Sequence, residues 1–124
     1  MGDVRVSDSE LEVLKVLWTR SPVSAGEIAG ELCSRRDWAE STVKSFLARL
    51  VKKGAVEQRR IGRNFEYRPL IDRESYVERE GSVFLRNFFD GAPEELMLFF
   101  ARKAKIGADD FKELEKLIRE QEEK

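Results

Sequence analysis

The chain opens with apolar and polar positions that alternate with the period of an α-helix. Residues 7–20 begin with Ser7 and Glu10, three positions apart, which is the spacing of a capping box at a helix start. The pattern stops before Pro22, so a first amphipathic helix is predicted over this segment. Its inward stripe is expected to be Leu11, Leu14, Leu17 and Trp18, widened by Val13 and Val16.

Residues 24–35 repeat the same arrangement. Ser24 and Glu27 form a second capping box, and a second helix is predicted after them. Cys33, near the end of this helix, is expected to be a small, half-buried side chain. The residues expected to face inward are Ala25, Ile28, Ala29 and Leu32.

A third helix is predicted over residues 37–53, DWAESTVKSFLARLVKK. Asp37 and Glu40 have the spacing to cap its start, and Gly54 stands where a C-terminal cap glycine belongs. The apolar positions follow the i, i+3, i+4, i+7 rule and form one stripe. That stripe consists of Val43, Phe46, Leu47 and Leu50.

The opposite face of this third helix is small near its start and basic towards its end. A small face lets the backbone come close to a narrow partner, and Ser, Thr and Lys side chains reach phosphates and base edges. We therefore predict a recognition helix for duplex DNA; the alternative is an ordinary solvated surface helix. Trp38 is expected to fill the junction with the second helix. The outer positions are Ser41, Ser45, Ala48 and Lys52, flanked by Lys44 and Arg49.

After the third helix the spacing changes to that of β-strands. Strands are predicted over residues 56–60 and 65–70, and the glycine in the loop 61–64 favours a hairpin. Three helices followed by a hairpin are typical of a winged helix-turn-helix, whose third helix enters the major groove while the wing reaches flanking phosphate or minor groove. The alternative is a winged helix that docks proteins rather than DNA. The basic residues gathered at the hairpin tip are Arg59, Arg60 and Arg63.

Residues 71–124 are predicted to form a second domain of three short helices, after a winged-helix domain over residues 1–70. The fold class is therefore mainly α with a small β-hairpin wing. Short helices in so small a domain can hardly bury the many phenylalanines found there, whereas a second copy would cover them in a symmetric homodimer. The alternative is that these helices pack back on the first domain. The expected dimerisation residues are Val77, Phe84, Phe88, Leu96, Phe99, Phe100, Leu114, Leu117 and Ile118.

Charge is distributed unevenly along the 124 residues, although the formal net charge is only -1. Residues 1–70 contain 13 Lys and Arg against 10 Asp and Glu, and residues 71–124 contain 10 against 14. Within residues 35–68 the count is 10 basic against 4 acidic side chains. A basic block in a nearly neutral chain indicates a polyanionic partner for that block alone.

The composition excludes several kinds of site. The chain has no histidine and one cysteine, which argues against a histidine metal site, a Ser-His-Asp triad or a metal cluster. No phosphate-binding glycine loop occurs, so neither an enzyme nor a cofactor is expected. No segment approaches the ~20 apolar residues that cross a bilayer, and the N-terminus lacks the apolar core of a signal peptide. We expect a cytoplasmic protein without membrane contact.

Motifs along nearly the whole chain resemble those of one family. The segments SDSELEVLKVLW, WAESTVKSFLARLVKKGAV and GRNFEYRPLID are similar to those of the penicillinase repressor group, which includes methicillin-resistance and copper-responsive repressors. The resemblance implies a homodimeric repressor that binds a pseudo-palindromic operator with TACA and TGTA half-sites. It places DNA contacts on Ser41, Thr42, Ser45 and Arg49, and on Arg63 of the wing.

The sequence departs from this family's pattern in three places. Family members often have Ser-Pro at the start of the third helix, where this chain has Ala39 and Glu40, and a carboxylate there would repel the DNA backbone. The C-terminal cysteine pairs of the copper-responsive branch are missing. In the β-lactam branch a regulatory protease cuts an Asn-Phe bond, which corresponds here to the Phe99–Phe100 bond, so only the second residue matches.

Overall fold

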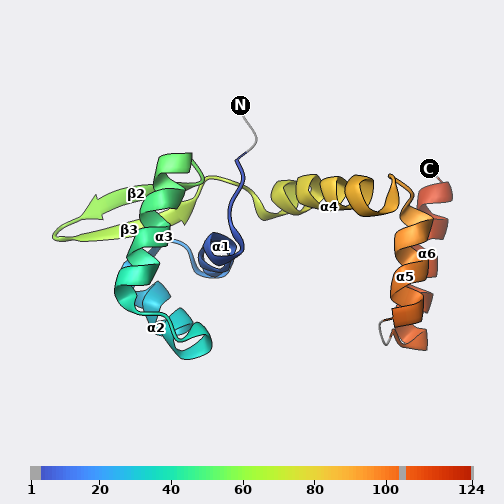
Figure 1. Cartoon of the computed structure of the whole chain (residues 1–124), viewed down its shortest axis with the longest axis horizontal. Coiled ribbons are helices and arrows are strands. Elements are labelled where there is room, and N and C mark those ends of the chain that lie inside the picture. Colours follow the sequence, from blue (N-terminus) through green and yellow to red (C-terminus); the bar gives the residue numbers. More distant parts are fainter. Residues whose placement is uncertain (1–3, 104–105, 124) are drawn as a thin grey trace. The chain divides into compact units, whose positions relative to one another are not determined.

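The computed structural model describes residues 4–103 and 106–123 (Figure 1). This part of the chain holds six helices and three short strands, which confirms the predicted fold class. The chain divides into two compact units, Met1–Val77 and Glu78–Lys124, which we name the first unit and the second unit. The elements in order are α1 (Asp8–Arg20), β1 (Val23–Ser24), α2 (Ala25–Arg36), α3 (Glu40–Lys53), β2 (Val56–Ile61), β3 (Asn64–Pro69), α4 (Arg73–Phe89), α5 (Pro93–Lys103) and α6 (Ala108–Glu122).

The starts of α1 and α2 confirm the two predicted capping boxes. In α1 the backbone N–H of Glu10 donates to Ser7 Oγ at 3.1 Å, and the Glu10 carboxylate accepts from the Ser7 N–H at 2.8 Å. Ser24 and Glu27 make the same reciprocal pair at the start of α2. These bonds satisfy amide groups that the first turn leaves without helical partners, which fixes where each helix begins.

The inward stripe of α1 is centred differently from the prediction. Val13 and Val16 are fully enclosed, whereas Leu11 and Trp18 are only half-buried at its edges. The prediction placed Val13 and Val16 off the centre of the stripe, where they widen it. The difference arises because α1 is covered by both α3 and β3, so its apolar arc is wide.

The start of α3 differs from the prediction, which began this helix at residue 37 with Asp37 as its cap. The helix begins at Glu40, and Ala39 precedes it without a side-chain cap. Asp37 instead ends α2 in the left-handed conformation, at φ 58°, and its N–H donates to the carbonyl of Cys33. The predicted cap at the other end is confirmed, since Gly54 ends α3 with φ 82°.

The three strands form one antiparallel sheet in the order β1-β3-β2. The hairpin between β2 and β3 is tighter than predicted, because Ile61 pairs with Asn64 and only Gly62 and Arg63 form the loop. Gly62 has φ 63°, as the first residue of a two-residue hairpin loop often requires. Strand β1, which has only two residues and pairs Val23 with Tyr67, was not predicted.

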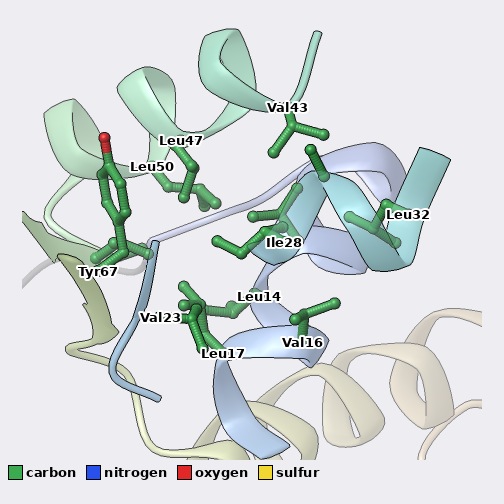
Figure 2. Close-up of a cluster of buried hydrophobic side chains, with 14 residues drawn as sticks. Leu14, Val16, Leu17, Val23, Ile28, Leu32, Val43, Leu47, Leu50 and Tyr67 are labelled. Carbon is green, nitrogen blue, oxygen red and sulfur yellow. The ribbon is translucent and has the colours of Figure 1, made fainter. Parts of the chain in front are cut away.

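The first unit has a complete hydrophobic core, shown in Figure 2. Its side chains come from α1, α2 and α3 and from both edges of the sheet, so all three helices pack around one centre. Leu14, Ile28 and Leu47 have no exposed surface. The predicted inward residues of α3 are confirmed, with Val43, Leu47 and Leu50 fully buried and Phe46 half-buried. Helix α3 is therefore held by the core along its whole inner side.

The structure divides the chain after Val77, whereas the sequence analysis placed the division after residue 70. The first turn of α4 belongs with the first unit because Tyr76 lies against Trp18 of α1, with ring centroids 5.9 Å apart. Tyr76 is the buried residue of α4, and the rest of that helix beyond Val77 belongs to the second unit.

The second unit has no comparable core. Neither α5 nor α6 contains a buried residue within the part of the chain described. Phenylalanine rings meet at tilted angles along its apolar side, as in the pair Phe89 and Phe99, whose ring centroids are 5.8 Å apart, but large parts of several rings stay exposed. On α6 the large apolar side chains of Phe111, Leu117 and Ile118 are exposed in the single chain.

Candidate nucleic-acid interface

The outer side of α3 presents one continuous polar surface, which we name the recognition face. Its residues occupy the positions opposite the buried stripe, as the helical period requires. Thr42, assigned to DNA by the family resemblance, is half-buried at the edge of this face. The exposed residues of the recognition face are Ser41, Lys44, Ser45, Ala48, Arg49 and Lys52.

Lys53 fixes the C-terminal end of α3 to the start of α1. Its ammonium group donates to the Glu10 carboxylate and to the carbonyl of Arg5. Glu10 is only 2% exposed, so burial alone would raise its pKa; hydrogen bonds from Lys53 and Ser7, with the charge of Lys53, outweigh burial and lower this pKa. Lys53 therefore positions α3, while its neighbour Lys52 stays on the recognition face.

Arg49 is held in place by an aromatic ring. Its guanidinium carbon lies 5.7 Å from the centroid of the Phe46 ring, and Phe46 in turn packs against Trp38 at 5.2 Å. A cation over an aromatic face gains about 0.5–1 kcal/mol at an exposed site and loses rotamer freedom. Trp38 fills the junction between α2 and α3, as predicted, and the stack also orients Arg49 on the recognition face.

A groove of about 580 Å³ runs between the start of α2, the start of α3 and the wing; we name it the interface groove. Its walls bring together side chains that are far apart in the sequence. Two cations, Lys44 and Arg63, line it together with one acid, Glu40. The remaining lining residues are Ser24, Ala25, Gly26, Gln58, Asn64, Phe65 and Tyr67.

The three predicted tip arginines lie in or close to the hairpin loop, and the strand register separates Arg59 from Arg60 on opposite faces of the wing. Arg63 lines the interface groove with α3. Arg59 is paired across the strands with Glu66, on the opposite face of the hairpin from Tyr67. Arg60 donates from Nε to the carbonyl of Gly62 at 3.1 Å, which holds its side chain along the wing loop. Arg63 therefore lies beside α3 in this groove, and Arg60 is on the same strand face as the groove residues Phe65 and Tyr67.

Glu40 is the acidic exception on this otherwise basic surface. It is exposed, and its Oε1 would lie 3.6 Å from a Cβ added at Gly26, so the carboxylate faces the first turn of α2. The positive end of the α2 dipole stabilises a negative charge at this place. The sequence flagged Glu40 as a departure from the family, and the structure shows that it faces α2 within the interface groove.

Sequence reasoning missed the groove residues of the sheet, Gln58 and Phe65. Both share a strand face with Tyr67, whose burial raises the pKa of its hydroxyl. The alternation along each strand could have indicated this, once the register was known. The register itself depends on the two-residue loop, which the sequence analysis made longer.

The residues that the structure describes form neither a metal-binding cluster nor a membrane-spanning helix. No group of three or more His, Cys, Asp or Glu side chains there could hold a metal ion. None of the described helices is long and apolar enough to cross a membrane.

Comparison with known proteins gives a family match over nearly the whole chain. The penicillinase repressor family model matches residues 6–120. The penicillinase repressor of Bacillus licheniformis is 34% identical over 116 residues, which cover 94% of this chain and 91% of the relative. The methicillin resistance regulatory protein MecI of Staphylococcus aureus is 26% identical over 113 residues, 91% of this chain and 92% of the relative.

Solved structures similar to this chain include winged-helix repressors. The solution structure of the DNA-binding domain of the repressor BlaI is 40% identical, with a TM-score of 0.55, and covers 62% of this chain and 95% of that one. The monomeric form of Bacillus licheniformis BlaI in complex with the blaP half-operator is also 40% identical, with a TM-score of 0.54 and the same coverage. The oxidized form of MarR from E. coli shares the fold at 16% identity, with a TM-score of 0.54, over 93% of this chain and 74% of that one.

Proposed function

This chain belongs to the penicillinase repressor family, a family of transcriptional repressors rather than enzymes, and from that premise we propose that it represses transcription as a homodimer on a two-half-site operator. Each protomer would supply one first unit to one half-site, and the second units would pair. Such a protein works where the chromosome is, so we place it in the cytoplasm.

The observation that carries this proposal is that α3 has one side buried in the core and the opposite, polar side exposed. Its inner stripe is built into the core, and Lys53 fixes its C-terminal end, so the recognition face is held rigidly outwards. Small side chains at Ser41 and Ser45 allow close approach to the major groove, and Arg49 can donate two hydrogen bonds to a guanine. BlaI, whose DNA-binding domain has the same fold, is seen bound to a half-operator. We infer that α3 enters the major groove of the operator, with DNA contacts from Ser41, Thr42, Lys44, Ser45, Arg49 and Lys52.

The wing is proposed to bind the DNA backbone beside the major groove. Arg63 lies with Lys44 in the interface groove, so both charges can meet phosphates on one strand. Arg59 and Arg60 add positive charge on the wing, and their contribution would be independent of sequence because phosphates carry no base information.

The apolar surface of the second unit is proposed to be the dimer interface. Phe88 is 71% exposed and Leu117 is 50% exposed in the single chain. A run of large exposed apolar side chains on one small unit is typical of a surface that a partner covers. A second copy would meet it with the same surface, as a two-fold interface requires. The residues proposed to pair are Val77, the last residue of the first unit, and from the second unit Phe84, Phe88, Leu96, Phe99, Phe100, Leu114, Leu117 and Ile118.

The decisive experiment is fluorescence anisotropy of the full-length chain on three duplexes in a salt series. The first duplex is an operator selected from a random-sequence pool by the protein itself, the second holds one of its half-sites, and the third is unrelated. We expect the operator to bind most tightly and the unrelated duplex about a thousandfold more weakly. Equal affinity for all three would remove the sequence-specific proposal, and no binding to any duplex would favour the protein-docking alternative.

Control by a regulatory protease that cuts the second unit is the finer part of this proposal. The bond between Phe99 and Phe100 lies within α5, and both side chains are exposed. A protease binds its substrate in an extended form, so this turn of α5 would have to unwind before cleavage. Mass spectrometry of the chain recovered from cells before and after exposure to a β-lactam tests it, because a fragment ending at Phe99 should appear only after exposure.

A further inference from the structure

The connection between the winged helix and α4 is short and held at every residue. Only residues 70–72 separate β3 from α4. The N–H of Leu70 donates to the carbonyl of Ala55 at 2.8 Å, just after α3. The carbonyl of Ile71 accepts from Trp18 Nε1 at 2.9 Å, and Asp72 accepts from the N–H of Tyr76 and caps the first turn of α4. This segment is therefore a fixed joint rather than a flexible linker.

Trp18 is the centre of that joint. It donates to Ile71 and packs its ring on Tyr76, whose side chain is only 6% exposed. The contacts of Trp18 thus hold both the connection and the first turn of α4 against α1, inside the first unit. Trp18 and Tyr76 do not line the interface groove, so neither is placed among the proposed DNA contacts. We name Trp18, Ile71 and Tyr76 the α4 anchor.

Beyond the anchor, α4 continues without a break. It runs as one helix from Arg73 to Phe89 and passes Val77, where the first unit ends. A continuous helix transmits the direction of its first turn, whereas a flexible chain of the same length would let its ends move independently. The contacts of Trp18 with Ile71 and Tyr76 therefore hold the first turn of α4 within the first unit.

We propose that the α4 anchor fixes the spacing of half-sites that the dimer accepts, with Trp18 as the positioning residue. This inference rests on the proposed dimeric repressor. Two first units joined through their second units bind two half-sites together most tightly when the connection holds them at the right separation and rotation. Each added base pair moves a half-site by about 3.4 Å and by about one tenth of a turn. If the joint is fixed, the displaced half-site no longer meets the second recognition face, and the operator affinity falls. If the joint is loose, the second first unit can follow the half-site, and the operator affinity changes little.

The test is binding of full-length Trp18→Ala and Trp18→Phe to a spacing series. The probes are the selected operator, the same duplex with one or two base pairs added between the half-sites, and the single half-site. We expect the unaltered chain to lose at least about tenfold when the spacing changes. In Trp18→Ala the operator affinity should fall about tenfold while the half-site affinity stays within about twofold, so the spacing preference nearly disappears. Trp18→Phe keeps the ring contact but loses the donor to Ile71, and should show an intermediate preference.

Trp38→Phe is the matched control, since it makes the same change at a half-buried tryptophan that packs on Phe46. It should change the operator and its spacing variants by one common factor and leave the spacing preference intact. A spacing preference in Trp18→Ala equal to that of the unaltered chain overturns the proposal. So does an equal loss on half-site and operator, which would mean that Trp18 only stabilises the first unit. If the unaltered chain sediments as a monomer, or binds operator no better than half-site, the dimeric function itself fails.

Discussion

Both units of this chain consist largely of helices, but they differ in how far their apolar side chains are buried. The first unit encloses its leucines and valines around one centre and leaves a polar recognition face outside. The second unit carries its phenylalanines and leucines on the surface, and α5 and α6 have no buried residue among those described. The first unit therefore completes its hydrophobic core within a single chain, whereas the large apolar side chains of the second unit remain exposed within a single chain.

Removal of the second unit should give the largest effect. A fragment of residues 1–77, which keeps the α4 anchor, should fold, remain monomeric and bind the operator about a hundredfold to ten-thousandfold more weakly than the full chain. Its half-site affinity should be unchanged. Sedimentation and anisotropy measure both quantities. A fragment that bound the operator as tightly as the whole chain would show that the second unit does not couple two first units.

A leucine in each unit tests the difference in burial directly. Leu47→Ala removes a fully enclosed side chain and should lower the free energy of unfolding of the first unit by about 2–5 kcal/mol. Leu117 is half-exposed in one chain. Leu117→Ala should therefore leave the stability of the first unit unchanged and weaken the dimer instead. Both tryptophans lie in the first unit, so their fluorescence during urea unfolding reports that unit alone. Equal losses of tryptophan-reported stability would break the comparison.

Arg49 tests whether recognition belongs to the first unit. Arg49→Ala should weaken operator binding by about 1–3 kcal/mol if its guanidinium contacts a base, and should leave binding to unrelated DNA nearly unchanged. A uniform loss on all duplexes with a flatter salt dependence would assign it to phosphate. Arg119→Ala, an exposed arginine of α6, is the control in the second unit and should leave the affinity per dimer unchanged.

Lowering the pH should reduce the stability of the first unit because Glu10 becomes protonated. Its pKa is lowered in the folded chain, so the ion pair with Lys53 stabilises the fold fully above the ordinary value of 4.5 and this contribution is lost as the pH falls through the lower, folded value. Glu10→Gln should therefore be less stable than the parent at neutral pH, and the difference should shrink below pH 4.5. Tryptophan-monitored urea unfolding from pH 7 to pH 3 gives the two curves. A difference that did not change with pH would exclude the ionised pair as its cause.

Substitutions in the wing should have the smallest effect on DNA binding, and the effect should differ between two arginines of the same hairpin. Arg63→Gln should reduce binding to operator and to unrelated DNA by a similar factor of a few, because it removes about one phosphate contact. Arg59→Gln, on the other face of the hairpin, should have less effect. A loss confined to the operator in Arg63→Gln would mean that the wing responds to bases or to groove width.

Much of the first unit was predictable because its signals are local. Both capping boxes, the buried stripe of α3 and the glycine that ends it were predicted within a few residues, since each depends on neighbours along one or two helical turns. The recognition face follows from the same period. The membership of the chain in a repressor family was also visible in its motifs and is confirmed by the family match.

Other features of the site could not be predicted because they depend on contacts between distant segments. Asp37 has the spacing of a cap for α3, yet the end of α2 takes it into the left-handed conformation. Tyr76 gave no special signal, and its burial follows from a tryptophan nearly sixty positions earlier in the chain. The wing arginines look alike in sequence, and the strand register sends them to different faces.

The sequence by itself determined the order of the helices, the winged-helix class and the face of α3 that stays outside, because periodicity and capping act over a few residues. The tertiary structure alone decided which charges share the interface groove, why Lys53 positions α3 while Lys52 remains on its surface, and where the first unit ends. Those features arise from side chains brought together across dozens of residues, such as Lys53 with Glu10 and Trp18 with Ile71. Such pairs become neighbours only when the core that joins their helices has formed.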